Sequence, residues 1–319
     1  MQAPTYADIL AAREFISAYL PKTSLVRSHK LSEALGCDYY LKLENLQPVG
    51  AFKVRGGVNL VGHAAREGRN ETIVTASTGN HGQSIGYAGR LFNTHVIVYA
   101  PAENVNQAKL QAMRELGAEV RLHGRDFDEA RLETERVANA EGFRYVHSAN
   151  EPLLISGVGT IGLEIFEDLP DVDVIIAPAG GGSCASGNCI VARERNPNVK
   201  VIAVQSEAAP AMWHAWRNRN LDPYPTMKTE HEGLATRVPF ELPSQILWQL
   251  LCDFVLVSDE QINDAVRILA RDAKQLVEGA GAASLAAAFK LRDQLRGKKV
   301  VGVVSGGNLP LTRFAQLLA

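Results

Sequence analysis

Lys53 lies in the part of this sequence that best suits covalent chemistry. With Gly50, Ala51, Phe52 and Val54 it opens a helical stretch directly after a strand-like run. A primary amine next to an aromatic side chain, on a turn marked by glycine, can bind an aldehyde as an imine. Most lysines are simply solvated, so Lys53 alone proves no such site. Its interpretation depends on three further segments that match other parts of one cofactor.

Three consecutive glycines separate a buried-strand pattern from a helical run. Gly180, Gly181 and Gly182 follow the apolar residues 174–177, and the helical run begins near Ser183. Such a junction gathers free backbone N–H groups at the positive end of a helix dipole, where an anion binds. Glycine lets phosphate oxygens come close, and Ser183 can cap the helix and add a hydroxyl donor. The loop indicates a phosphate site, with an unliganded tight turn as the alternative, and it lacks the Walker lysine.

Two more segments place polar side chains at the ends of predicted strands. In residues 75–83, hydroxyl groups, an amide and the N–H groups of a helix start can surround a carboxylate. His81 in this segment is assigned a positional role and not proton transfer. Residues 300–304 form a buried-strand pattern that ends in Ser305, followed by Gly-Gly-Asn. Open parallel sheets bind ligands at the carboxyl ends of their strands, so Ser305 is well placed to contact a ring nitrogen.

The elements that must position these residues follow a regular alternation. Short β-branched runs predict strands at residues 39–43, 72–76, 95–100, 119–122, 172–177, 199–204, 254–257 and 299–304. Helical patterns separate most of them, and this βαβ alternation predicts an α/β fold with a mainly parallel sheet covered on both faces. Residues 220–243 contain four prolines and are too long for an ordinary connection. We expect this segment to fold over a partner subunit or over the active site.

Composition excludes several classes of function. The chain of 319 residues has a formal net charge of −2, which argues against a protein that binds nucleic acid or a membrane surface. No apolar run approaches the length of a membrane span, and residues 1–20 lack the order of a secretion signal. The four cysteines show neither Cys-x-x-Cys nor metal-finger spacing. A reducing cytoplasm suits them.

In order and spacing, the four segments resemble the fold-type II pyridoxal 5'-phosphate enzymes, specifically the serine/threonine dehydratase and serine racemase group. The resemblance covers nearly the whole chain and includes residues 41–48, 157–162 and 278–281. It implies a two-lobed fold like that of the tryptophan synthase β subunit. Residues 1–66 and 146–319 would form the large cofactor-binding domain, and residues 67–145 a small domain that closes over the substrate.

The resemblance also implies a role for each segment. Lys53 would form the Schiff base with pyridoxal phosphate, and Phe52 would pack against its ring. Asn80 would bind the 3'-oxygen of the cofactor, and Ser305 would bind its pyridine nitrogen. The phosphate would be bound by Gly180, Gly181, Gly182 and Ser183. The substrate carboxylate would be held by Ser77, Thr78, Asn80 and His81.

The resemblance implies a dehydratase, or ammonia-lyase, for L-serine, L-threonine or a close analogue. Lys53 would remove the α-proton, the β-hydroxyl would leave, and a 2-oxo acid and ammonia would be released. The alternatives are a serine racemase, a 3-hydroxyaspartate dehydratase-like enzyme, a β-replacement enzyme and a non-catalytic protein that binds a phosphate ligand. Thr78 stands where racemases of the group carry a catalytic serine, and its extra methyl restricts χ1. We therefore expect dehydration to dominate.

Departures from the family pattern lead to two further expectations, and the resemblance itself leads to a third. Gln205 stands where members with a divalent cation supply the first carboxylate, and Glu207 is the one acidic residue nearby, so we expect no metal. The residues after Asn308 leave no room for the regulatory domain of biosynthetic threonine dehydratases, so the resemblance implies a catabolic enzyme. It also implies a homodimer.

Overall fold

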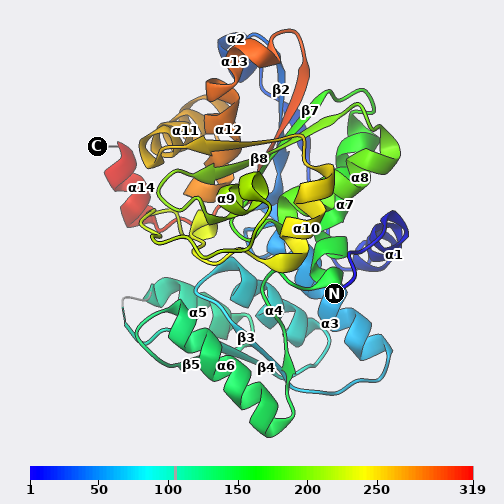
Figure 1. Ribbon diagram of the computed structural model, residues 1–319, viewed down its shortest axis with the longest axis vertical. Coiled ribbons are helices and arrows are strands. Elements are labelled where there is room, and N and C mark those ends of the chain that lie inside the picture. Colours follow the sequence, from blue (N-terminus) through cyan, green and yellow to red (C-terminus); the bar gives the residue numbers. More distant parts are fainter. Residues whose placement is uncertain (104–105, 319) are drawn as a thin grey trace.

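The computed structural model describes residues 1–103 and 106–318 and contains two separate β-sheets (Figure 1). The larger sheet has six strands, in the spatial order β1 (Leu25–Arg27), β2 (Asp38–Leu43), β10 (Lys299–Val304), β7 (Val174–Pro178), β8 (Lys200–Ser206) and β9 (Asp253–Val257). β1 pairs with β2 in the antiparallel direction, and the other pairings are parallel. This sheet lies in the upper part of Figure 1.

The smaller sheet, in the lower part of Figure 1, is parallel throughout. Its four strands are, in spatial order, β5 (Glu119–Leu122), β4 (Val96–Ala100), β3 (Ile73–Ala76) and β6 (Arg144–Tyr145). The eight predicted strands are thus confirmed. The sequence patterns missed β1 and β6, because each is short and lies at the edge of its sheet, where no run of buried β-branched residues is required.

Helices cover both faces of the larger sheet because its central strands are apolar on both sides. Ile175 of β7 packs against α7 (Pro152–Asp168), α8 (Ser183–Arg195) and α10 (Glu241–Leu250). The next residue, Ile176, belongs to the core on the other face. The helices on that face are α2 (His29–Leu35), α11 (Asp259–Ala273) and α12 (Gly279–Lys290).

The smaller sheet is covered in the same way. Its strands pack on one face against α3 (Lys53–Arg66), α4 (Asn80–Leu91) and α5 (Gln107–Glu115), and on the other against α6 (Phe127–Glu141). The remaining helices are α1 (Tyr6–Ile16), α9 (Ala211–Asn218), α13 (Arg292–Leu295) and α14 (Leu311–Leu318), with short 3-10 turns η1 (Glu44–Leu46) and η2 (Glu232–Leu234). The α/β fold with mainly parallel sheets flanked by helices is confirmed.

α3 packs closely on α7 and so links the two sheets. A side chain on Gly56 would lie 2.8 Å from the Leu154 carbonyl, and one on Gly157 would lie 2.5 Å from the Arg55 carbonyl. Glycine at both positions lets the two helix backbones approach, because nothing larger than hydrogen fits between them. This contact holds the first turn of α3, where Lys53 lies, against the larger sheet.

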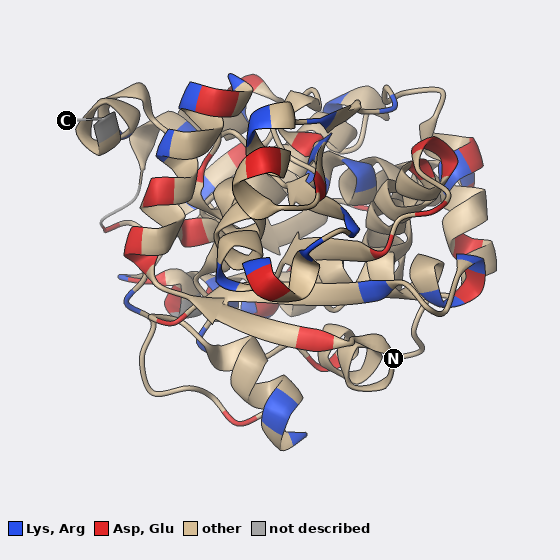
Figure 2. Ribbon diagram, turned by 90° about the horizontal axis from the view of Figure 1, so that it is seen from above, with Lys and Arg blue, Asp and Glu red and all other residues tan. Residues whose placement is uncertain are grey.

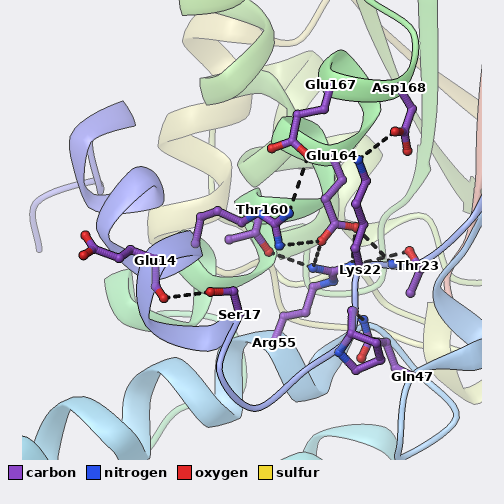
Figure 3. Close-up of polar contacts among 12 residues, drawn as sticks. Glu14, Ser17, Lys22, Thr23, Gln47, Arg55, Thr160, Glu164, Glu167 and Asp168 are labelled. Atoms are coloured by element: carbon purple, nitrogen blue, oxygen red, sulfur yellow. Dashed lines mark hydrogen bonds and ion pairs between the residues drawn. The ribbon is translucent and has the colours of Figure 1, made fainter.

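Four buried charged side chains form a cluster behind that turn, which we call the buried charge cluster: Lys42, Glu44, Arg55 and Glu164. Figure 3 shows two of them, Arg55 and Glu164, with some of their contacts. Arg55 Nε lies 2.7 Å from Glu44 Oε2, and its Nη2 lies 2.8 Å from Glu164 Oε2. Lys42 Nζ lies 2.6 Å from the same Glu164 oxygen. Two positive and two negative charges thus compensate each other out of water.

Charged residues elsewhere lie along the outer helices, with both signs interspersed (Figure 2). On α6, for example, Arg131 pairs with Glu135 and Arg136 pairs with Glu133. No helix among the described residues is long and apolar enough to cross a membrane.

Candidate active site

The segments singled out from the sequence follow the carboxyl ends of parallel strands and are linked by direct contacts. Lys53 is the first residue of α3, and its Nζ donates to the Ser148 carbonyl at 3.2 Å. The same nitrogen lies 5.5 Å from the centroid of the Phe52 ring. The Phe52 N–H donates to the carbonyl of Ser305, which follows β10, at 3.0 Å. The structure therefore brings Lys53, Phe52 and Ser305 together.

The surroundings of Lys53 favour its neutral amine. Burial lowers the pKa of Lys53 from 10.5 to about 8. The Cys184 thiol opposes this shift, but burial raises the pKa of that thiol too, so it stays uncharged near neutral pH. A fraction of Lys53 is therefore a neutral amine, and hence a base or nucleophile, at mildly alkaline pH.

The glycine loop joins β7 to α8, as predicted, and Gly182 has a φ of +86°. A side chain on Gly180 would lie 2.2 Å from the Gly233 carbonyl, and one on Gly181 would lie 2.9 Å from the Phe240 ring. These glycines are therefore needed for packing within the protein itself, and not only for the close approach of a ligand. Gly233 and Phe240 belong to the proline-rich segment at residues 220–243. This segment therefore folds over the candidate site, which is one of the two alternatives predicted for it.

The first turn of α8 offers backbone donors to an anion. Gly182 occupies the N-cap position, and no side chain in the described part of the chain caps the helix. The prediction that Ser183 caps the helix is therefore wrong. Gly182, with its left-handed backbone, takes the N-cap position, and Ser183 is the first residue of the helix. The N–H groups of a first helical turn lack intrahelical acceptors. They are free to bind a phosphate, which the helix dipole also favours.

The four residues predicted to hold a carboxylate lie in the loop between β3 and α4 and in the first turn of α4. Ser77 Oγ accepts hydrogen bonds from the N–H groups of Gly79, at 3.1 Å, and Gly82, at 2.9 Å, so this hydroxyl shapes the loop. Thr78 is half-buried, and no residue that the structure describes hydrogen-bonds to its hydroxyl. Asn80 begins α4, and its amide contacts Glu278 and Asn308.

His81 is buried and uncharged, and its hydrogen bonds define its tautomer. The Thr75 hydroxyl donates its one proton to the Val146 carbonyl at 2.7 Å, so it must accept from His81 Nε2, 2.9 Å away. Nδ1 then carries a lone pair, and it has no partner among the described residues. Burial and the nearby Lys53 and His147 lower the pKa of His81 well below its usual value. His81 can thus accept a hydrogen bond but not supply a proton, in line with its predicted positional role.

Three residues that contact this site carried no role in the sequence analysis. Ser148 supplies the carbonyl that binds Lys53, and Glu278 and Asn308 hold the Asn80 amide. Glu278 and Asn308 adjoin glycines in segments that follow strands or open helices. That position is the signal that could have identified them, whereas Ser148 acts through its backbone and leaves no sequence signal.

We expect removal of divalent cations to leave the protein unchanged. The Gln205 side-chain oxygen accepts from the Trp213 N–H at 3.1 Å, and the exposed Glu207 pairs with Lys290. The described residues contain no group of three or more His, Cys, Asp or Glu side chains suited to a metal ion. The check is calorimetry with Mg²⁺ and Ca²⁺ after chelation, together with the thermal unfolding midpoint; stoichiometric binding of either cation would contradict the expectation.

The residues present fit a phosphate-bearing aromatic aldehyde. An amine with a lowered pKa, an uncapped helix N-terminus and a buried hydroxyl at Ser305 lie around Phe52 and Ser148. The aldehyde, the phosphate and a ring nitrogen each have a chemically matched group. His81 Nδ1, which has no partner among the described residues, adds a buried hydrogen-bond acceptor to the site.

Comparison with known proteins agrees with this chemistry. The model of the pyridoxal-phosphate dependent enzyme family matches residues 16–306. An L-threonine ammonia-lyase of Thermotoga maritima is 38% identical over 314 residues, which cover 98% of this chain and 78% of the relative. A catabolic L-threonine dehydratase of Staphylococcus aureus is 36% identical over 315 residues, covering 98% of this chain and 91% of the relative.

Among solved structures, maize serine racemase superposes with a TM-score of 0.93 at 28% identity, covering 99% of this chain and 97% of that one. The match extends over both sheets and the helices that cover them. The chain therefore belongs to the pyridoxal-phosphate dependent enzyme family and has its fold-type II architecture.

Proposed function

We propose that this protein is a pyridoxal-phosphate dependent ammonia-lyase that converts L-threonine or L-serine to a 2-oxo acid and ammonia. The observation that carries the proposal is the position of Lys53: an amine with a lowered pKa lies beside Phe52 and the Ser148 carbonyl, near enough to the buried His81 of α4 to lower the pKa of that imidazole. The relatives named as L-threonine ammonia-lyase and catabolic L-threonine dehydratase support the same activity and a catabolic role.

Each group of the cofactor has a residue to hold it under this proposal. Lys53 would bond its aldehyde carbon, Phe52 would pack on its ring and Ser305 would contact its ring nitrogen. The phosphate would lie on the N–H groups of the glycine loop and the start of α8, at Gly180, Gly181, Gly182 and Ser183. When bound, pyridoxal phosphate delocalises the electron pair left on the α-carbon of the substrate.

The protein's own groups would handle the substrate and the proton. The backbone N–H groups of Asn80 and His81 at the start of α4, with the hydroxyls of Ser77 and Thr78, would hold the carboxylate and so orient the α-carbon toward Lys53. Lys53 Nζ, whose neutral form burial favours by lowering its pKa, would take the α-proton. Ser305 has a neutral hydroxyl, which does not hold a ring nitrogen protonated as a carboxylate would, and this favours prompt loss of the β-hydroxyl.

We also propose the organisation of the chain around this site. Residues 1–66 and 146–319 would form the cofactor-binding domain, and residues 67–145, which contain the smaller sheet, would close over the substrate. The protein would act as a homodimer in the cytoplasm. Sedimentation and the substrate dependence of small-angle scattering would test the assembly and the closure.

The proposed reaction is tested by incubating the cofactor-loaded enzyme with L-threonine and L-serine. We expect 2-oxobutanoate or pyruvate in equal amounts with ammonia, and a cofactor-sized mass increment on the peptide of Lys53 after borohydride reduction. A panel that includes 3-hydroxyaspartate, and L-serine with an added thiol, separates the acidic-substrate and β-replacement alternatives. A protein that shows no visible absorption band and forms no product from any substrate of the panel would contradict the proposal.

Racemisation is the second candidate activity, and Thr78 is the residue that supports it. Its half-buried hydroxyl has no hydrogen-bond partner among the described residues and lies in the loop that would face the substrate. We expect Thr78→Ser to raise the yield of D-serine relative to pyruvate several-fold, because the smaller side chain regains rotamer freedom at χ1. Thr78→Ala is expected to abolish D-serine formation. Chiral chromatography measures the ratio, and equal D-serine in all three proteins would contradict a role for this hydroxyl.

The pKa of Lys53 leads to a prediction for the cofactor-free protein. The protonated amine cannot attack an aldehyde, so covalent uptake of the cofactor should rise with pH through a midpoint near 8. An exposed lysine, with the ordinary pKa of 10.5, would show its midpoint well above this range. Stopped-flow absorbance measures the rate, with a free lysine derivative as the control. A midpoint equal to that of the control would show that burial does not lower the pKa.

A further inference from the structure

We propose that Asn308 and Glu278 are positioning residues that fix the orientation of the Asn80 side-chain amide, so that one of its N–H bonds stays free for the cofactor. The proposal rests on the proposed function, in which Asn80 binds the 3'-oxygen of the cofactor. Asn80, Glu278 and Asn308 are here called the amide relay. Their side chains are joined by hydrogen bonds of 2.6 Å and 2.8 Å, although they come from α4, the start of α12 and the segment after β10.

The orientation follows from one backbone group whose chemistry is unambiguous. The Val49 carbonyl can only accept, so the atom of Asn308 that lies 2.9 Å from it must be the Nδ2 donor. The same Nδ2 lies 2.8 Å from Asn80, and its second N–H therefore points at the Asn80 oxygen. Both N–H bonds of Asn308 are then used. The ambiguity between oxygen and nitrogen that usually attends an amide is resolved by this chain of contacts.

The far end of the relay agrees with this orientation. With Oδ1 of Asn80 facing Asn308, its Nδ2 faces Glu278 Oε1 at 2.6 Å, and a carboxyl oxygen accepts there. Burial raises the pKa of Glu278, while Lys109 and the bond from Asn80 oppose the rise. The assignment holds whether or not Glu278 is protonated, because it is set from the Val49 end. The second N–H of Asn80 Nδ2 has no acceptor among the residues that the structure describes.

Two glycines in the motifs make room for the relay. A side chain on Gly306 would lie 2.5 Å from Glu278 Oε1, and one on Gly50, whose φ is +68°, would lie 2.6 Å from Asn308 Oδ1. The Gly306 carbonyl also accepts from the Glu278 N–H at 3.1 Å, and the Gly50 carbonyl accepts from the Gly307 N–H at 2.8 Å. The backbone next to Lys53 and the backbone after β10 thus hold the relay from both sides.

The orientation matters because the two ends of an amide have opposite polarity. A donated N–H stabilises an anionic oxygen, whereas a carbonyl turned the other way would repel it. An unconstrained asparagine can turn over at small cost, so the free N–H would be lost for part of the time. The relay removes that freedom before the cofactor binds.

The test measures cofactor affinity and the visible absorption of the bound cofactor, with thermal unfolding of the cofactor-free protein as a structural control. Asn308→Ala and Glu278→Met each break the relay. We expect the dissociation constant of pyridoxal phosphate to rise by about ten- to a hundredfold, as for loss of a hydrogen bond to a charged group. The pH midpoint of the visible band should rise, because the anionic oxygen loses a donor.

Two variants serve as matched controls. Glu278→Gln keeps an acceptor for Asn80 and should restore most of the affinity that Glu278→Met loses. Asn45→Ala removes a neighbouring asparagine that pairs with Gln275, at 3.1 Å, and not with Asn80. It should leave both readouts unchanged.

A double-mutant cycle with Asn80→Ala decides between the relay and a general structural effect. If the relay acts through Asn80, Asn308→Ala has no further effect once Asn80 is alanine. Equal losses in both backgrounds, or wild-type affinity in Asn308→Ala and Glu278→Met, would overturn the inference. Should Asn308→Ala fail to fold, the pair Glu278→Met and Glu278→Gln tests the relay from its other end. A wild-type protein that binds no cofactor would refute the proposed function instead.

Discussion

Lys53→Ala is expected to lower kcat/KM for L-threonine by about a thousandfold or more, because the variant loses both the covalent anchor and the base. The cofactor-sized mass increment on this peptide after borohydride reduction should disappear as well. Lys53 carries an amine with a lowered pKa beside the Phe52 ring, and the Phe52 N–H in turn binds the Ser305 carbonyl. Initial-rate assays of 2-oxobutanoate, with cofactor in excess, measure the effect.

Two further substitutions make that result specific. Lys53→Arg keeps the positive charge but cannot form an imine, and it should be as inactive as Lys53→Ala. Lys200→Ala removes an exposed lysine at the start of β8 and should retain full activity. Deamination that survives in Lys53→Ala at a rate near that of the wild type would refute the assignment of Lys53.

The buried charge cluster should produce the largest effect on stability. Arg55→Met leaves Glu44 and Glu164 buried without their common partner, and each is fully inaccessible to solvent. We expect a loss of about 3–5 kcal/mol in the free energy of unfolding, the usual result of breaking a buried ion pair from one side. Urea denaturation of the cofactor-free protein, followed by circular dichroism, measures it.

An exposed ion pair provides the matched control for that experiment. Arg136→Met breaks the pair with Glu133 on the outer surface of α6, where the arginine side chain is 65% exposed. Solvent screens this pair, so the unfolding midpoint should hardly change. Equal effects of the two substitutions would show that burial of the cluster contributes nothing.

The cluster also connects stability with the active site. Arg55 lies two residues after Lys53 in α3, and Thr160 of α7 accepts a hydrogen bond from its Nη1 at 3.1 Å. The ion-pair partners of Arg55 come from η1 and α7, so they hold the first turn of α3 against the larger sheet. The pattern around Lys53 in the sequence predicts its helix, but not the four-membered ion cluster behind it. Hydrophobic periodicity indicates which face of a helix is apolar and buried. It assigns charged residues to the surface, so it cannot predict charged side chains that are buried.

Patterns along the chain determined most of what is local at this site. β-branched runs located eight of the ten strands, and glycines next to strand ends marked the phosphate loop and the turns near Lys53 and Ser305. These features depend on backbone conformation and burial of a few neighbouring residues, which short segments encode directly. The predicted cap by Ser183 was wrong because the left-handed turn at Gly182 takes the cap position.

Only the tertiary structure decided which distant side chains meet. Asn80 and Glu278 are 198 residues apart, and Asn308 and the Val49 carbonyl are 259 residues apart. Their contacts exist because β2, β10 and β3 end near one another, and strand order is a property of the whole fold and not of any segment. The same holds for the lowered pKa of Lys53 and the tautomer of His81. Both depend on which groups the packed protein places around them, and no sequence pattern records this.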